Sequence, residues 1–148
     1  MNITYNDRKK NLPCEQLYHL FFSAGWAGTE RDPNTEKHKY FNTPFKNSTL
    51  VISAWDKKRL VGAVRVLSDK FVRAVILDLI VDPEYQDKGI GKELVKRCIA
   101  HWPNCEWLVQ TEKHIAAYYE KIGFKIYEDV VLTIPSIWQK RKQEEREN

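Results

Sequence analysis

The chain has 148 residues, which is enough for one domain of ordinary size with a hydrophobic core. Hydrophobic residues make up 43% of it and aromatic residues 12%, a composition that excludes a disordered protein. The net charge of +4 comes from basic residues interleaved with acidic ones, so we expect no nucleic-acid partner. We also expect a cytoplasmic protein without a membrane partner, because no apolar run approaches a membrane span and the N-terminal residues lack an apolar signal region.

The three cysteines, Cys14, Cys98 and Cys105, are spaced neither like the ligands of a zinc site nor like a disulfide framework. We therefore expect reduced thiols and no bound metal.

In chain order, the first elements expected are a strand from Ile3 and a helix that Pro13 opens and Gly25 ends. The polar stretch 26–48 is interpreted as a loop with a short second helix. Two runs of β-branched residues follow, 49–55 and 60–67, and predict a hairpin because a charged turn joins them.

The second half of the chain starts with a predicted strand over residues 71–81 that is apolar on both faces, as in the middle of a covered sheet. The later elements expected are a helix after Gly91 with its apolar face over 94–102, a strand over 107–109, a helix over 114–122 ended by Gly123, and two closing strands over 124–127 and 130–134. This order predicts an α+β fold with a mixed, largely antiparallel central sheet and helices on both faces. We expect one domain over residues 1–138 and a frayed, charged tail over 139–148.

The stretch DPEYQDKGIGKEL, residues 82–94, lies between the predicted strand 71–81 and the following helix. The N-terminus of a helix carries unpaired N–H groups and the positive end of the helix dipole, which together favour an anion. Gly89 and Gly91 let the backbone approach such an anion closely, and Lys88 and Lys92 add positive charge. The pattern is typical of a pyrophosphate site, although a plain turn with solvated lysines is the simpler alternative.

Two common phosphate motifs do not fit this stretch. A P-loop needs Ser or Thr after its Gly-Lys pair, but Glu93 follows Lys92 here. A dinucleotide fingerprint needs a third glycine where this chain has Leu94. What remains is the pattern Q-x-x-G-x-G, which starts at Gln86.

This pattern resembles the acetyl-CoA loop of the GCN5-related N-acetyltransferase (GNAT) superfamily, and YEKIGF at residues 119–124 resembles the family's late helix and following strand. The segments AGW, RVLSD and ILDLIVDPEYQDKGIG are similar to small bacterial members and to plant serotonin N-acetyltransferases. The resemblance implies a GNAT acyl-CoA N-acyltransferase fold. It also implies transfer of acetyl from acetyl-CoA to a primary amine of a small molecule, by direct attack in a ternary complex.

The resemblance further implies where acetyl-CoA binds. Pantetheine would lie along Leu79–Val81, the amide at Leu79 would polarise the thioester carbonyl, and backbone amides of Asp87–Lys92 would hold the pyrophosphate. The expected cofactor-binding residues are Leu79, Ile80, Val81, Gln86, Asp87, Lys88, Gly89, Ile90, Gly91 and Lys92.

Tyr119 matches the family tyrosine that protonates the departing thiolate, a reaction that a phenol can perform. Tyr118 is its rival, and a plain core tyrosine is the structural alternative. The family often has asparagine seven residues earlier, where this chain has Glu112, and this difference puts one polar contact to the cofactor in doubt.

Asp78 is the leading candidate for the base that deprotonates the amine, because it is the only charge within the run AVILDLIV. An ion pair with Arg59 or Arg65 is an equally good interpretation of this residue. Glu112, His114 or a chain of waters are the remaining candidates for the base.

In the family, the acceptor lies against the first helices and the loop between them. The aromatic residues in this part of the chain are Trp26, Tyr40, Phe41 and Phe45, of which Trp26 and Phe41 are assigned to the acceptor. The identity of the amine stays open, as does a homodimer. Two other functions are kept as alternatives: an acyl-CoA-binding or sensing module without catalysis, and an acetyltransferase for a protein or peptide amine.

Overall fold

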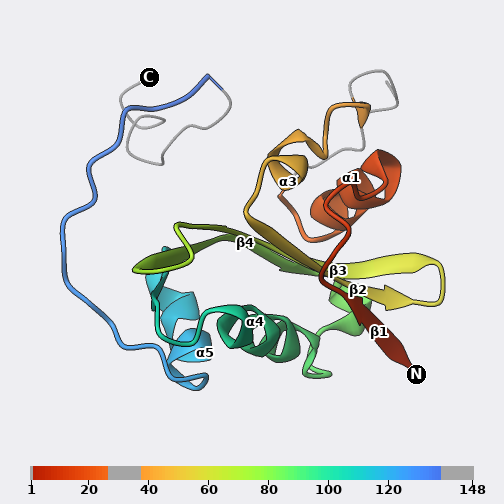
Figure 1. The fold of residues 1–148 in the computed structure, drawn as a ribbon. Coiled ribbons are helices and arrows are strands. Elements are labelled where there is room, and N and C mark those ends of the chain that lie inside the picture. The colour runs from red at the N-terminus through yellow and green to blue at the C-terminus, as the bar shows by residue number, and fades with distance from the viewer. Residues whose placement is uncertain (1, 27–37, 138–148) are drawn as a thin grey trace. The chain divides into compact units, whose positions relative to one another are not determined.

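A computed structural model describes residues 2–26 and 38–137 of the chain (Figure 1). The chain divides into two compact units, residues 1–115 and residues 116–148, which are described separately below. The single domain expected over residues 1–138 therefore stays a prediction, and the tail 139–148 lies outside the described residues.

A five-stranded sheet forms the framework of the first unit. Its strands follow one another in chain order: β1 (Ile3–Asn6), β2 (Leu50–Asp56), β3 (Arg59–Ser68), β4 (Arg73–Val81) and β5 (Glu106–Val109). The first four strands pair antiparallel, and β5 pairs parallel to β4. The mixed, largely antiparallel sheet expected from the sequence is confirmed.

The turn between β3 and β4 makes the fourth strand shorter than predicted. Lys70 adopts a positive φ of 66°, and the Asp69 carboxylate accepts hydrogen bonds from the N–H groups of Phe71, Val72 and Arg73. These bonds hold Phe71 and Val72 in the turn, where both side chains are exposed. The strand predicted from residue 71 therefore begins at Arg73.

Helices cover both faces of the sheet in the first unit, as expected (Figure 1). On one face lie α1 (Cys14–Ser23) and α3 (Thr43–Lys46), and on the other lies α4 (Ile90–His101). Pro13 is the N-cap of α1 and not part of its first turn.

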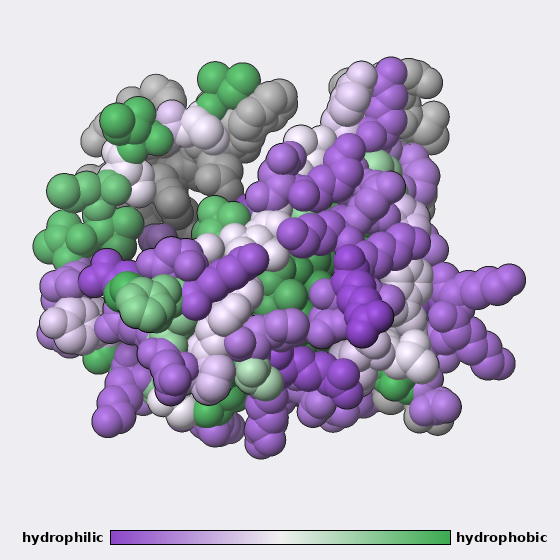
Figure 2. All heavy atoms as spheres, viewed as in Figure 1, coloured by the Kyte–Doolittle hydropathy of each residue, from purple (hydrophilic) through white to green (hydrophobic). Residues whose placement is uncertain are grey.

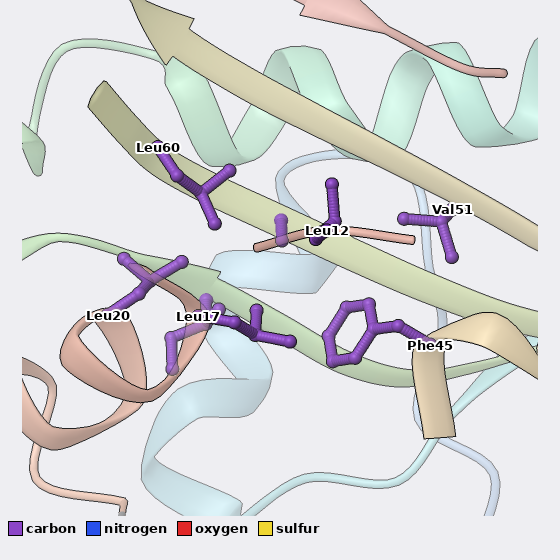
Figure 3. Packing of buried hydrophobic residues seen from close by; sticks show 8 residues of the cluster. Leu12, Leu17, Leu20, Phe45, Val51 and Leu60 are labelled. Carbon is purple, nitrogen blue, oxygen red and sulfur yellow. The ribbon is translucent and has the colours of Figure 1, made fainter. Parts of the chain in front are cut away.

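The core between α1, α3 and the sheet is built from aliphatic side chains and one aromatic ring (Figure 3). Its buried members are Leu12, Leu17, Leu20, Phe45, Val51, Leu60, Ala63 and Ile80. Ile80 points into this core, so the alternation of side chains along β4 turns its neighbours Leu79 and Val81 to the α4 face.

The second unit contains α5 (Ala116–Glu120), which follows a 3-10 turn at Lys113–Ile115. Helical structure is thus shorter than the helix predicted over 114–122. Gly123 has a positive φ of 120°, in agreement with its expected place after the helix.

The two closing strands predicted over 124–127 and 130–134 are wrong: the structure has no strand there. Val130, Leu132 and Ile134 are at least 84% exposed, and Figure 2 shows apolar side chains along this extended segment, which Figure 1 draws in blue. A β-branched run has high strand propensity, but it forms a strand only when a neighbouring strand pairs with it.

The three cysteines are free thiols, and Cys98 on α4 is buried. Among the residues described, no helix has the length and apolar character that a membrane crossing requires.

Candidate functional site

The start of α4 has the properties of an anion site. Gly89 is its N-cap with a left-handed φ of 81°, and no side chain caps the first turn. Asp87 also has a positive φ, 62°. The first N–H groups of a 12-residue helix are therefore left without side-chain partners at the positive end of its dipole.

Local hydrogen bonds shape the loop that leads into α4. Asp82 caps the 3-10 helix Pro83–Tyr85 by accepting a hydrogen bond from the N–H of Glu84 at 2.9 Å. The Gln86 side-chain amide donates to the carbonyl of Val81 at 3.0 Å, across the loop. This bond is consistent with the loop-shaping role expected for Gln86.

Side chains from the β2–β3 hairpin hold the same loop from outside. Arg59 pairs with Asp82 at 2.9 Å, and the Tyr85 hydroxyl donates to the Asp56 carboxylate at 2.6 Å. The bond to Asp82 raises the pKa of Arg59, and the bond to Asp56 raises the pKa of Tyr85. The sequence suggested Arg59 only as a partner of Asp78, because spacing alone does not tell which hairpin residue lies beneath the loop.

Lys88 and Lys92 bring positive charge to the start of α4. The Nζ atom of Lys88 lies 5.7 Å from the centre of the Tyr85 ring. No carboxylate among residues 2–26 and 38–137 forms an ion pair with either lysine. Both charges are therefore available to an anionic ligand.

The edge of β4 beside this helix start is unpaired. β5 pairs with β4 only from Arg73 to Ile76 and ends at Val109, whereas β4 continues to Val81. Within the described part of the chain, Leu79, Ile80 and Val81 thus pair with β3 on one side and with no strand on the other. Their backbone groups on that side can bind an extended ligand in the way a further strand would.

Asp78 lies on β4 next to a β-bulge and faces Arg65 on β3. The Arg65 Nε donates a hydrogen bond to Asp78 Oδ2, and both side chains are about four-fifths buried. Arg65 also lies over the Phe45 ring, 5.9 Å from its centre. Of the two ion pairs considered for Asp78, the one with Arg65 is the one formed.

Tyr119 lies on α5 in the second unit. Its side chain is buried, its ring packs edge-on against Phe124, and burial raises its pKa to about 12. Tyr118, its rival, is 39% exposed, and partial burial raises its pKa as well.

The two other side chains considered as bases, Glu112 and His114, form an ion pair with each other at 3.3 Å. Both side chains are more than half exposed. They therefore lie in water and not in an enclosed site.

The aromatic residues assigned to the acceptor are joined by one ring that the sequence reasoning missed. Phe21 of α1 packs edge-on against Trp26 at 5.6 Å, Phe41 at 5.3 Å and Phe45 at 6.1 Å between ring centres. We call Phe21, Trp26, Phe41 and Phe45 the aromatic wall. Tyr40 is not part of it, since its side chain is 67% exposed.

Comparison with known proteins gives consistent matches. A family model described as acetyltransferase (GNAT) domain matches residues 27–132. An uncharacterized N-acetyltransferase, ycf52, from Pyropia yezoensis is 30% identical over 81% of this chain and 69% of its own length. A protein from Glycine max named histone acetyltransferase TAP1 is 46% identical over 47% of this chain and 32% of its own length.

Among solved structures, a GNAT family acetyltransferase from Streptococcus pneumoniae superposes with a TM-score of 0.73. The match covers 92% of this chain and 99% of that protein at 24% identity. This likeness concerns the fold.

Proposed function

The family model covers more than half of the chain, which therefore belongs to the GNAT acetyltransferases, and from this premise we propose that it acetylates a primary amine of a small molecule. Its co-substrate is acetyl-CoA, as membership of the family implies. The observation that carries the proposal is the uncapped start of α4 beside the unpaired edge of β4. A pyrophosphate and an extended pantetheine chain need these two features next to each other.

The loop before α4 and the strand β4 bind different parts of acetyl-CoA. Backbone N–H groups from Asp87 to Lys92 hold the pyrophosphate, with added charge from Lys88 and Lys92. The free edge of Leu79–Val81 binds the pantetheine amides, and the N–H of Leu79 polarises the thioester carbonyl. The residues present fit the co-substrate, because Gly89 has no side chain to occupy the place of the phosphates.

Transfer then follows by direct attack. The acceptor nitrogen forms a bond to the carbonyl carbon, the carbon–sulfur bond breaks, and the thiolate takes a proton from Tyr119. The amine loses its proton to Asp78, directly or through water. Arg65 donates its hydrogen bond to Oδ2 of this carboxylate and leaves Oδ1 to accept the proton.

The aromatic wall supports a small acceptor with an apolar body. Trp26 is 54% exposed and adjoins Phe21 and Phe41, so a planar or aliphatic group can pack on exposed ring surface. Arg65 and Asp78 lie at the other end of the wall, beyond Phe45. An amine on an apolar stem suits this order of groups.

A protein amine is the second candidate, and the name of the Glycine max relative is what favours it. Both candidates are tested by a panel of arylalkylamines, polyamines, aminoglycosides and a lysine-containing histone peptide, with release of free CoA as the readout. The proposal predicts turnover of a small amine and slow or no turnover of the peptide. If only the peptide is acetylated, a protein amine replaces the small molecule as the proposed acceptor.

A further inference from the structure

A buried histidine lies beside the aromatic wall, and no role in acetyl transfer requires it. His38 is only 3% exposed, and its Nδ1 lies 2.6 Å from Glu15 Oε1 on α1. Because the carboxylate can only accept, Nδ1 carries the hydrogen and donates it. The Glu15 side chain is 48% exposed, so the bond joins a buried ring to a carboxylate at the surface.

The His38 ring is also stacked on an aromatic ring of α1. Its centre lies 3.8 Å from that of Tyr18, with 19° between the two planes. Tyr18 in turn packs edge-on against Phe41 at 5.4 Å and 84°. His38 thus reaches Phe41, a member of the aromatic wall, through one intervening ring.

The second ring nitrogen of His38, Nε2, distinguishes the imidazole from an apolar ring. Nε2 is buried and has no hydrogen-bond partner among the described residues. A buried polar atom without a partner costs free energy that an apolar ring of the same shape would avoid. What the imidazole offers beyond a phenyl ring is its bond to Glu15.

Among residues 2–26 and 38–137, the charged and titratable groups found around His38 come from two segments. On α1 these are Glu15, which it bonds, and Tyr18, on which it stacks, while the Cys14 thiol donates to the carbonyl of Lys39 at 3.3 Å. Next to it in the chain, Lys39 directs its Nζ to the Tyr40 ring at 5.1 Å. Glu15 is thus the carboxylate in direct contact with the imidazole.

We propose that His38 is a positioning residue for the acceptor amine: it holds Tyr18 and Phe41 in place. The proposal rests on the proposed function, because it assigns the aromatic wall to the acceptor. The bond to Glu15 fixes the orientation of the imidazole, and the stacked imidazole limits the movement of the Tyr18 ring.

The first test needs neither acetyl-CoA nor an acceptor. In the full chain labelled with ring-¹³C phenylalanine, the Phe41 signal is identified by its loss in Phe41→Leu, and it should change position in His38→Asn, which loses the ring stacked on Tyr18. His38→Phe retains a flat ring on Tyr18, so the change should be smaller. A Phe41 signal that is unchanged in His38→Asn would overturn the proposal.

The second test uses the amine found by the panel. His38→Asn retains a donor at the Nδ1 position but loses the ring. The acceptor KM should therefore rise about fivefold, the factor that corresponds to the loss of one aromatic pair. Acetyl-CoA affinity should stay unchanged. His38→Phe retains a flat ring and should raise the acceptor KM less than His38→Asn does, and kcat should stay close to the wild-type value in both variants.

The two tests fail in distinguishable ways. If the wild type does not bind acetyl-CoA, the proposed function fails, while the Phe41 signal still decides whether His38 controls the wall. If acetyl-CoA binds and turns over but acceptor KM is unchanged in both His38 variants, the positioning role is contradicted and the enzyme assignment stands.

Discussion

Gly62 of β3 lies against Ile90, the first residue of α4. A Cβ atom placed on Gly62 would come 3.3 Å from Ile90 Cγ2 and 3.3 Å from Leu94 Cδ1, closer than side chains normally pack. The absence of a side chain at residue 62 therefore lets the start of α4 lie close to the sheet. This places the helix N-terminus near the end of β4, where both parts of the proposed acetyl-CoA site meet.

Enlarging residue 62 should displace this helix start. Gly62→Ala requires Ile90 and Leu94 to move by a few tenths of an ångström and should have a small effect, whereas Gly62→Val should lower stability by about 1–3 kcal/mol and weaken acetyl-CoA binding. Urea unfolding and calorimetric titration measure the two effects. Wild-type affinity in Gly62→Val would contradict the idea that this contact positions the site.

Tyr119 should be required for turnover but not for binding. Tyr119→Phe removes only the hydroxyl, so kcat should fall by about 10²-fold or more while acetyl-CoA affinity is retained. Tyr118→Phe is the matched control and should keep wild-type kcat. Equal losses in the two variants would argue against a specific proton donor.

The pH profile gives a separate check on Tyr119. Burial raises the pKa of Tyr119 to about 12, so the hydroxyl keeps its proton at all pH values well below that. Loss of this proton should therefore cause no decline of kcat up to about pH 10, the ordinary pKa of tyrosine. A decline near that pH in the wild type that is absent from Tyr119→Phe would show that the donor titrates normally.

Comparing the free energy of unfolding with kcat in variants of Asp78 and Arg65 tests whether Asp78 acts as the base or only as the ion-pair partner of Arg65. Each of Asp78→Asn and Arg65→Met breaks this largely buried pair, and the double variant should show a coupling free energy of about 1–3 kcal/mol by urea unfolding. If Asp78 is the base, Asp78→Asn should lose much more kcat than Arg65→Met, and its pH profile should change. Similar losses of kcat in both would assign the pair a structural role alone.

Cys98 should play no covalent role in transfer. Burial on α4 raises the pKa of its thiol to about 12, so the nucleophilic thiolate is scarce at any pH at which the enzyme works. Cys98→Ala should keep its kcat and lose about 1–2 kcal/mol of stability from the cavity it creates. Mass spectrometry that detected an acetylated Cys98 during turnover would contradict direct transfer.

Much of the first unit could be predicted from the sequence because its signals are local. Two β-branched runs and the charged turn between them predicted the β2–β3 hairpin. The helix predicted after Gly91 begins one residue before it, at Ile90, because Gly89 supplies the left-handed N-cap. The boundary at Arg73 was missed because the Asp69 carboxylate binds three N–H groups and extends the turn into an apolar run.

The remaining features depend on partners that lie far apart in the sequence. The bonds from Arg59 to Asp82 and from His38 to Glu15 join residues more than 20 positions apart, and no local pattern specifies them. The same reason explains the strands wrongly predicted after Gly123. Strand propensity is a property of the segment itself, whereas a strand needs a neighbour that pairs with it.

The central claim is that the glycine loop before α4 holds the pyrophosphate of acetyl-CoA, and calorimetric titration of the wild type and of Gly89→Glu tests it most directly. The matched control is Gly89→Asn, because asparagine tolerates the left-handed conformation and adds no charge. We predict micromolar binding by the wild type, weaker binding by Gly89→Asn and none by Gly89→Glu, whose carboxylate would occupy and repel the phosphate position. Failure of the wild type to bind acetyl-CoA, or equal binding by Gly89→Glu, would contradict the assignment of this site.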